Sequence, residues 1–413
     1  MKITYLMNEF PVLTENFIIY EIDGLLKRHV DIRVLSLAKP ADERFSDIPE
    51  KSGFAHLIKY ARQFNNEKLH GIYSLFWLLR LACKGRFSAI SKILKDKSQL
   101  GIYPRFHLLR IAHQIEICHP GSDILFCHFG PLGKLGASLK YYGLIKHKLI
   151  TSYHGYDLSR YIKTHGEDAY ENLFKYADKL LFVSDYFRKK AISLGATAEK
   201  TEVVHTAIDC QLFSYQPRQY PQEPVFRFIT VGRLTPKKDH ASLVKVFARL
   251  IEANPQRQLS LKILGAGPDQ ALISEAIHSS NVAEQVQLLG AMQHADVLKQ
   301  LNQSDIFVLN CVTADDGDEE GIPGSLMEAM ALGMPVVSTD HTGVPELVEH
   351  LQSGLIAQEK NNETLLAMLQ TILDRPELWP LFSQRGRQKV ESDFERNKES
   401  DKLLAILHKL NRQ

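Results

Sequence analysis

Two glutamates, Glu320 and Glu328, flank a turn that is rich in glycine and proline. Residues 305–310 before the turn are apolar and β-branched, which favours a buried strand. Residues 325–331 after it all favour a helix, and Ser325 is placed to cap that helix. Free N–H groups and the positive end of the helix dipole point the same way at such a turn. The spacing therefore predicts an anion site between two carboxylates.

The ligand that suits this arrangement carries both phosphate and hydroxyl groups. The glycine turn offers backbone N–H groups to a phosphate, whereas the two carboxylates repel phosphate and accept hydrogen bonds from hydroxyl groups. A nucleotide sugar has a phosphate in its middle and hydroxyl groups at both ends. The alternative is that Glu320 only ends an acidic run and Glu328 is a solvated helix residue; for an isolated carboxylate pair, both interpretations stay open. The residues assigned to the turn are Gly321, Ile322, Pro323 and Gly324.

The pattern Glu-x7-Glu, closed by Glu-Ala-Met-Ala, resembles the retaining glycosyltransferases of family 4, which have the GT-B fold. This resemblance implies that Glu320 contacts the donor sugar and that Glu328 contacts the ribose of the nucleotide. The residues after the first expected strand read Phe-Pro-Val-Leu-Thr-Glu instead of a glycine-rich loop. That version resembles the subgroup that builds bacterial exopolysaccharides such as colanic acid and capsules.

Two further motifs occur in the order that this family shows. His154 begins a His-Gly-x-Asp motif directly after the apolar residues 148–153, and Arg233 and Lys238 follow the apolar residues 226–231. A planar arginine fork and a mobile lysine charge together suit a diphosphate. By resemblance, His154 faces the donor sugar and Arg233 and Lys238 clamp the diphosphate. The alternatives are a structural histidine at a strand end and an ordinary basic loop.

Two weaker motifs complete the expected nucleotide site. Gly267 belongs to a Gly-x-Gly-Pro turn after residues 259–264, where Gln270 takes the place of the third glycine of a dinucleotide fingerprint. We expect Gly267 to allow a close backbone approach to the nucleotide. Met292 lies just after the expected strand 286–290, and its loop resembles the base-contacting loop of the family.

The elements that position these residues alternate between strand and helix, beginning with β-α-β over residues 3–37. This alternation predicts the fold class α/β. The family resemblance further implies two Rossmann-like domains facing across a cleft (GT-B) and a C-terminal helix crossing back to the first domain. Residues 1–214 would be the acceptor-binding domain and 225–375 the nucleotide-sugar-binding domain, joined by a stiff polar linker. Residues 376–413 would be helices that pack back toward the N-terminal domain.

Composition limits the other possibilities. The chain has 413 residues and a net charge of only +2, so no global field points to a nucleic-acid partner. Its five cysteines lack any Cys-x-x-Cys spacing, which favours free thiols in a reducing compartment. No stretch of about 18 apolar residues predicts a membrane span. We therefore expect a cytoplasmic protein.

An Asp-x-Asp pattern, Asp316 and Asp318, formally matches the motif of metal-dependent glycosyltransferases. Those enzymes have a single-domain fold, and a basic clamp can do the work of a divalent ion at the diphosphate. We therefore expect no cofactor and no required metal, with a UDP- or GDP-sugar as donor.

Residues 56–113 are strongly basic, with eleven lysines and arginines against two acids. One interpretation is a buried helix with a solvated basic face. The other is attachment to anionic lipid headgroups on the inner face of the cell membrane, because basic residues beside Trp, Phe and Tyr suit that surface.

The predicted function is a retaining transfer of a hexose from a nucleotide diphosphate sugar to a saccharide or polyprenyl-linked oligosaccharide acceptor, in exopolysaccharide, capsule or lipopolysaccharide synthesis. Two alternatives stay open. One is a nucleotide-sugar epimerase of the same fold, and the other is a non-catalytic scaffold of a polysaccharide assembly complex.

Overall fold

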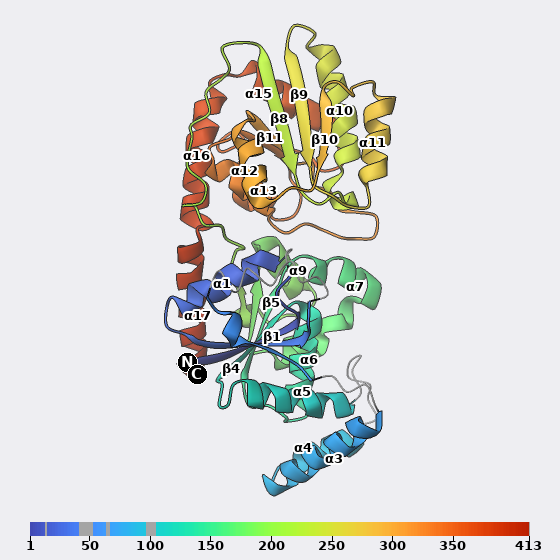
Figure 1. Ribbon diagram of the computed structural model, residues 1–413, viewed down its shortest axis with the longest axis vertical. Helices are drawn as coiled ribbons and strands as arrows, with labels where there is room; N and C mark the ends of the chain where they lie inside the picture. Colours follow the sequence, from blue (N-terminus) through green and yellow to red (C-terminus); the bar gives the residue numbers. More distant parts are fainter. Residues whose placement is uncertain (13–14, 41–52, 63–66, 96–104, 413) are drawn as a thin grey trace. The chain divides into compact units, whose positions relative to one another are not determined.

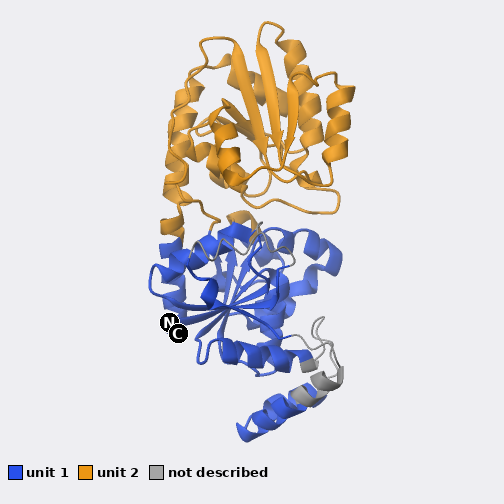
Figure 2. Cartoon of the chain, in the orientation of Figure 1, with its two compact units in different colours: residues 1–183, 188–204, 400–413 blue, residues 184–187, 205–399 orange. Residues whose placement is uncertain are grey.

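The computed structural model describes every residue except 13–14, 41–52, 63–66, 96–104 and 413, and it forms two compact units (Figures 1 and 2). Unit 1 contains residues 1–183, 188–204 and 400–413; unit 2 contains residues 184–187 and 205–399. Parts of the Phe-Pro-Val-Leu-Thr-Glu motif and of the basic segment therefore lie outside the described residues.

Unit 1 is built on a seven-stranded parallel sheet in the order β3-β2-β1-β4-β5-β6-β7. The central strand β4 is buried along its whole length, as expected for a parallel sheet covered on both faces. The strands are β1 (Lys2–Glu9), β2 (Asp31–Ala38), β3 (Ile58–Tyr60), β4 (Ile124–His128), β5 (Lys148–Tyr153), β6 (Lys179–Phe182) and β7 (Thr201–Val203). The helices are α1 (Asn16–Leu26), α3 (Glu67–Cys83), α4 (Phe87–Lys95), α5 (Arg105–Cys118), α6 (Gly130–Tyr141), α7 (Arg160–His165), α8 (Glu171–Tyr176) and α9 (Asp185–Ser193), with 3-10 turns at Ala55–Leu57, Tyr156–Leu158, Glu167–Tyr170 and Ala198–Lys200.

Unit 2 repeats this plan with a six-stranded parallel sheet in the order β10-β9-β8-β11-β12-β13. Alternate residues of its strands enter two hydrophobic clusters, because neighbouring side chains of a strand point to opposite faces. The strands are β8 (Val225–Val231), β9 (Gln258–Leu264), β10 (Val286–Gly290), β11 (Ile306–Val308), β12 (Val336–Thr339) and β13 (Leu355–Ala357). The helices are α10 (His240–Ala253), α11 (Gln270–Ser279), α12 (His294–Asn302), α13 (Gly324–Ala331), α14 (Val344–Leu347), α15 (Asn362–Asp374) and α16 (Leu378–Asp393), with a 3-10 turn at Pro236–Lys238. The last helix, α17 (Arg396–Arg412), begins in unit 2 and belongs to unit 1 from Ser400 onward.

In both sheets the chain reverses its direction of growth beside the first strand. The reversal lies between β1 and β4 in unit 1 and between β8 and β11 in unit 2. Ligands of open parallel sheets bind outside the carboxyl ends of the strands at such a point. The prediction of two parallel α/β domains is confirmed, and the strand order directs attention to the loops after β4, β5, β8 and β11.

The structure divides the C-terminal tail between the two units. Trp379 and Phe382 of α16 are buried in the core of unit 2, so this helix completes that domain. Leu403 and Leu407 of α17 are buried in the core of unit 1. The predicted return of a C-terminal helix to the first domain is thus confirmed, and it concerns α17 from Ser400 onward.

Among the described residues, no helix is long and apolar enough to cross a membrane. The five cysteines have free thiols, as their spacing predicted, and only Cys83 is exposed.

We predict that Gly24→Ala disturbs the packing of α17 on α1. A Cβ atom at position 24 would overlap the hydroxyl oxygen of Ser400 and lie 3.1 Å from its Cβ. Such overpacking lowers the free energy of unfolding by about 1–3 kcal/mol. Thermal unfolding of Gly24→Ala and of Gly24→Ala combined with Ser400→Ala measures the effect. The second substitution removes the overlapping oxygen, so the double variant should regain most of the lost stability; equal melting temperatures for the two variants would contradict this contact.

Candidate functional site

The loop between β11 and α13 ends in the predicted anion-binding turn (Figure 1). Helix α13 begins at Gly324, and Pro323 occupies its N-cap position. A Cβ atom at Gly324 would meet nothing within 4 Å, so the space in front of the first helical residue is open. The arrangement leaves room for a ligand at the helix N-terminus, and the role of the turn remains a prediction.

The prediction that Ser325 caps this helix is wrong. The helix starts one residue earlier than expected, and the Ser325 hydroxyl donates instead to the backbone oxygen of Val231 at 2.8 Å. This bond ties the first turn of α13 to the end of β8, the strand that leads to Arg233.

Glu320 and Lys238 form an ion pair at the carboxyl edge of the sheet. The Nζ atom of Lys238 lies 2.9 Å from Oε2 of Glu320, and Nζ of Lys237 lies 3.8 Å from the same oxygen. Burial opposes ionisation of Glu320, but the charges of Lys238 and Lys237 outweigh it and lower the pKa of this carboxyl to about 2. Burial also works against the charged amine, yet Cys311 and Glu320 raise the pKa of Lys238 above its usual value. Both groups are therefore charged at neutral pH.

Lys237 connects this pair to the acidic run. Its Nζ atom lies 3.2 Å from Oδ2 of Asp318 and donates to the backbone oxygen of Glu319 at 3.3 Å. The neighbouring Asp316 accepts a hydrogen bond from the backbone N–H of Asp318 at 2.9 Å. Within the described ranges, no group of three or more His, Cys, Asp or Glu side chains is arranged to hold a metal ion.

Arg233 is exposed on the loop after β8, and its charge helps to lower the pKa of Glu320. A second loop packs closely beneath it. A Cβ atom at Gly265 would overlap the carbonyl oxygen of Gly232, and one at Gly267 would overlap that of Leu234. These glycines are required for the contact between the two loops. A contact of Gly267 with the nucleotide remains a prediction.

Sequence reasoning missed the residues that hold the backbone of Glu320. The backbone N–H of Glu320 donates to Nε2 of His341 at 2.9 Å, and Thr342 donates to the carbonyl oxygen of Glu320 at 2.6 Å. Because Nε2 accepts, Nδ1 of His341 carries the proton that it donates to Glu359 at 2.9 Å. The one signal that could have indicated His341 is its position directly after β12, because sites of parallel sheets lie at the carboxyl ends of the strands.

Glu328 lies on α13, and its carboxylate is 3.5 Å from Nε2 of His294 at the start of α12. The hydrogen bond with Glu328 raises the pKa of His294 above its usual value. Met292 lies in the loop before α12 and packs, half-buried, against the core. His294 is a neighbour of the predicted ribose site that sequence reasoning missed, because a histidine on an exposed helix carries no distinctive pattern.

His154 belongs to unit 1, where it follows β5 and is partly exposed. Its backbone N–H donates to Asp157 at 2.8 Å, and the other oxygen of Asp157 accepts from the N–H of Gly130 at 2.8 Å. Its ring contacts His128, with 2.9 Å between Nε2 of His154 and Nδ1 of His128. Burial lowers the pKa of His154 well below its usual value, so the ring is neutral.

The structure thus brings Arg233, Lys238 and Glu320 together in unit 2, with Glu328 and Met292 on adjoining elements of the same unit. His154 forms a separate cluster in unit 1.

Comparison with known proteins assigns both units to one kind of protein. Residues 14–212 match the model of Glycosyltransferase Family 4, and residues 216–389 match that of Glycosyl transferases group 1. The chain is 30% identical, over 99% of its length, to all of the putative colanic acid biosynthesis glycosyltransferase WcaL of Escherichia coli K12. The chain belongs to this family of glycosyltransferases. The amylovoran biosynthesis glycosyltransferase AmsK of Erwinia amylovora is also 30% identical, over 99% of this chain and 100% of its own.

Solved structures show the fold of this glycosyltransferase. Anabaena Alr3699/HepE in complex with UDP superposes with a TM-score of 0.73 at 17% identity, over 99% of this chain and 100% of its own. The lipopolysaccharide outer core galactosyltransferase WaaB superposes with a TM-score of 0.70 at 17% identity, with the same coverage. These likenesses cover the full chain and confirm the predicted GT-B fold.

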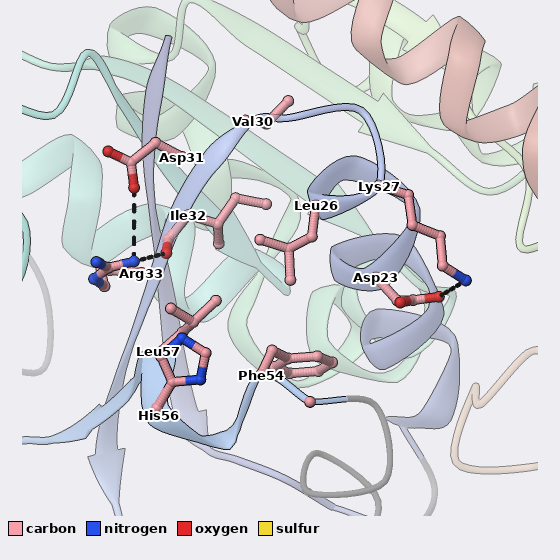
Figure 3. Close-up of a pocket in the computed structure, with 11 residues that line it drawn as sticks. Asp23, Leu26, Lys27, Val30, Asp31, Ile32, Arg33, Phe54, His56 and Leu57 are labelled. Atoms are coloured by element: carbon pink, nitrogen blue, oxygen red, sulfur yellow. Dashed lines mark hydrogen bonds and ion pairs between the residues drawn. The ribbon is translucent and has the colours of Figure 1, made fainter.

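A separate hollow of the glycosyltransferase lies between the end of α1 and the start of β2 (Figure 3). Its volume is about 480 Å³, and charged pairs, including Asp23 with Lys27 at 2.8 Å, stand at its walls. None of the predicted site residues lines it. It adjoins the amino end of β2, whereas the predicted residues follow the carboxyl ends of strands.

We predict that substitutions of Lys238 and Glu320 in the glycosyltransferase differ in their effects on nucleoside diphosphate affinity. Lys238→Ala should weaken binding of UDP or GDP by roughly 10- to 100-fold, because a charge-assisted contact is lost. Glu320→Gln should leave this affinity unchanged or raise it, because Lys238 loses its competing partner. Isothermal titration calorimetry measures both.

Arg249→Ala is the matched control, since it removes a positive charge on α10 that forms an exposed ion pair with Glu363 of α15. It should leave the affinity unchanged. If Glu320→Gln weakens binding as much as Lys238→Ala does, Glu320 contacts the nucleotide itself and its assignment to the sugar fails.

Proposed function

We propose that this glycosyltransferase moves a hexose from a UDP- or GDP-sugar to a saccharide acceptor and retains the anomeric configuration. The acceptor is a polyprenyl-linked oligosaccharide in exopolysaccharide, capsule or lipopolysaccharide synthesis. The relatives named for colanic acid and amylovoran biosynthesis support this acceptor class. Structures of Anabaena Alr3699/HepE in complex with UDP and with UDP-glucose support a nucleotide-sugar donor.

The observation that carries the proposal is the charged pair of Lys238 and Glu320 beside Arg233. During transfer, the bond from the anomeric carbon to the diphosphate breaks and the diphosphate keeps the bonding electrons. The acceptor oxygen bonds to that carbon as it gives up its proton. In this proposal, Lys238 and Arg233 stabilise the negative charge that develops on the diphosphate. Glu320, held ionised, accepts hydrogen bonds from sugar hydroxyl groups.

We further propose that transfer requires no divalent metal. Lys238 is already charged where the diphosphate would lie, and Asp318 of the Asp-x-Asp pattern is engaged by Lys237 at 3.2 Å. In this proposal Glu328 accepts hydrogen bonds from the ribose hydroxyl groups. These hydroxyl groups would replace His294 as the partner of Glu328.

The test is transfer from a panel of nucleotide sugars to lipid-linked saccharides in excess EDTA. Donors are first ranked by thermal shift, since a ligand that binds only the folded state raises the melting temperature. We expect transfer with retained configuration, and a fall in kcat on the order of 10²-fold or more in Lys238→Ala. Activity that Mg²⁺ or Mn²⁺ must restore would contradict the metal-free proposal. Conversion of the donor without any acceptor would favour an epimerase, and binding without turnover would favour a scaffold.

We also propose that α3 and α4 attach the glycosyltransferase to an anionic membrane surface. The two helices pack together (Figure 1). Leu75, Phe76 and Leu79 of α3 are each more than half exposed, as are Phe87 and Leu94 of α4. Exposed basic residues lie on the same two helices and their connection, namely Arg80, Lys84, Lys92 and Lys95. At a membrane surface, basic side chains are attracted to acidic lipid headgroups, and neighbouring apolar side chains can insert into the hydrocarbon beneath them.

Phe76→Ser combined with Leu79→Ser should reduce binding to vesicles that contain phosphatidylglycerol by roughly 10-fold or more, given the apolar area lost. Co-sedimentation at low and high salt measures this, and salt should weaken the wild-type interaction. Leu272→Ser removes a leucine that is 55% exposed on α11 and serves as the control. Failure of the wild-type protein to bind these vesicles even at low salt would rule out the attachment.

A further inference from the structure

A chain of polar side chains leads from the core of unit 1 to His154. The hydroxyl of Tyr5 donates to Oε1 of Glu21 at 2.7 Å, and Nε2 of His128 lies 3.2 Å from the same oxygen. Nδ1 of His128 then lies 2.9 Å from Nε2 of His154. The four residues come from β1, α1, the end of β4 and the loop after β5, so only the folded sheet brings them together.

The chemistry of each atom fixes the direction of these hydrogen bonds. Burial and Glu21 raise the pKa of Tyr5 well above its usual value, so Tyr5 keeps its proton and donates it. The carboxylate oxygen of Glu21 accepts, so Nε2 of His128 must donate. A neutral His128 then has a bare Nδ1, which can only accept. Nε2 of His154 must therefore carry a proton, which leaves Nδ1 of His154 bare.

We propose that Glu21, acting through His128, fixes the tautomer of His154 so that His154 presents an unprotonated Nδ1 to the substrate. Glu21 and His128 are positioning residues, and they act on a ligand through His154 alone. The proposal rests on the role of His154 under the proposed function, because it specifies what His154 can bind.

Packing holds this arrangement rigid. The His128 ring stacks against two aromatic neighbours, with its centroid 5.1 Å from that of Phe126 and 5.7 Å from that of Tyr5. Phe17 and Phe129 contact the His154 ring with centroids at 4.6 and 4.9 Å. In the part of the chain that the structure describes, Nδ1 of His154 forms no hydrogen bond with another residue, and the side chain keeps part of its surface exposed.

A bare imidazole nitrogen discriminates between the two kinds of group in a nucleotide sugar. A hydroxyl group has a proton to donate to it, whereas an ionised phosphate oxygen has none. This tautomer therefore makes His154 selective for hydroxyl groups over phosphate, which matches its expected position at the sugar. The opposite tautomer would offer an N–H that phosphate and hydroxyl oxygens both accept.

The direct test is ¹⁵N NMR of the full-length protein labelled at histidine, with the His154 signals assigned by comparison with His154→Gln. The wild-type protein should show a protonated Nε2 and a bare Nδ1 at His154. Glu21→Leu removes the acceptor and should give a mixture of tautomers. Tyr5→Phe removes only the distant hydroxyl group and should keep the wild-type tautomer of His154. Glu21→Gln retains an acceptor oxygen beside Tyr5, so it should show the wild-type tautomer and not the mixture expected for Glu21→Leu.

Transfer kinetics give the second readout. In Glu21→Leu, kcat should fall on the order of 10-fold, the worth of about one hydrogen bond, while UDP or GDP affinity stays unchanged. A protonated Nδ1 at His154 in the wild-type protein, a His128 ring protonated on both nitrogens at neutral pH, or an unaltered tautomer in Glu21→Leu would each overturn the proposal. Failure of the proposed function would show separately, as an absence of transfer from every donor despite the expected tautomer.

Discussion

Parallel pairing of the strands is the constraint on which both sites depend. In a parallel sheet every carboxyl end lies at the same edge, and the loops that leave this edge must meet there. The loops after β8, β11 and β12 carry Lys238, Glu320 and His341, which are distant in sequence and become hydrogen-bonded neighbours. The loops after β4 and β5 bring His128 and His154 together in the same way.

The ion pair of unit 2 explains how a lysine can stay charged in a largely buried position. An unpaired buried ammonium would be costly, and Glu320 removes that cost before any ligand arrives. The same carboxylate is held ionised by two lysines, so it keeps its capacity to accept hydrogen bonds. In the proposed function, a diphosphate takes over the partnership with Lys238, and Glu320 is then free to accept hydrogen bonds from hydroxyl groups. The two roles are therefore coupled through one interaction.

Unit 1 uses a carboxylate for a different purpose. Glu21 supplies no charge to a ligand in this arrangement, because His128 stands between it and His154. Its effect is on the position of a proton within a chain of neutral rings. In unit 2 a carboxylate, Glu320, keeps Lys238 charged. In the arrangement proposed for unit 1 a carboxylate, Glu21, keeps a lone pair on Nδ1 of His154.

The sequence by itself determined the strand-helix alternation, because periodicity is a local pattern. The resemblance of its motifs to a known family implied the GT-B fold and the candidate residues Arg233, Lys238, Glu320, Glu328 and His154. Sequence reasoning misassigned Ser325, since the choice between a helix cap and the Val231 carbonyl depends on where the helix meets β8. Only the tertiary structure decided the partners: His341 under Glu320, His294 beside Glu328, and Glu21 behind His128. These contacts join residues from separate strands and helices, and their energy depends on burial and on distances of a few ångströms that no local pattern encodes.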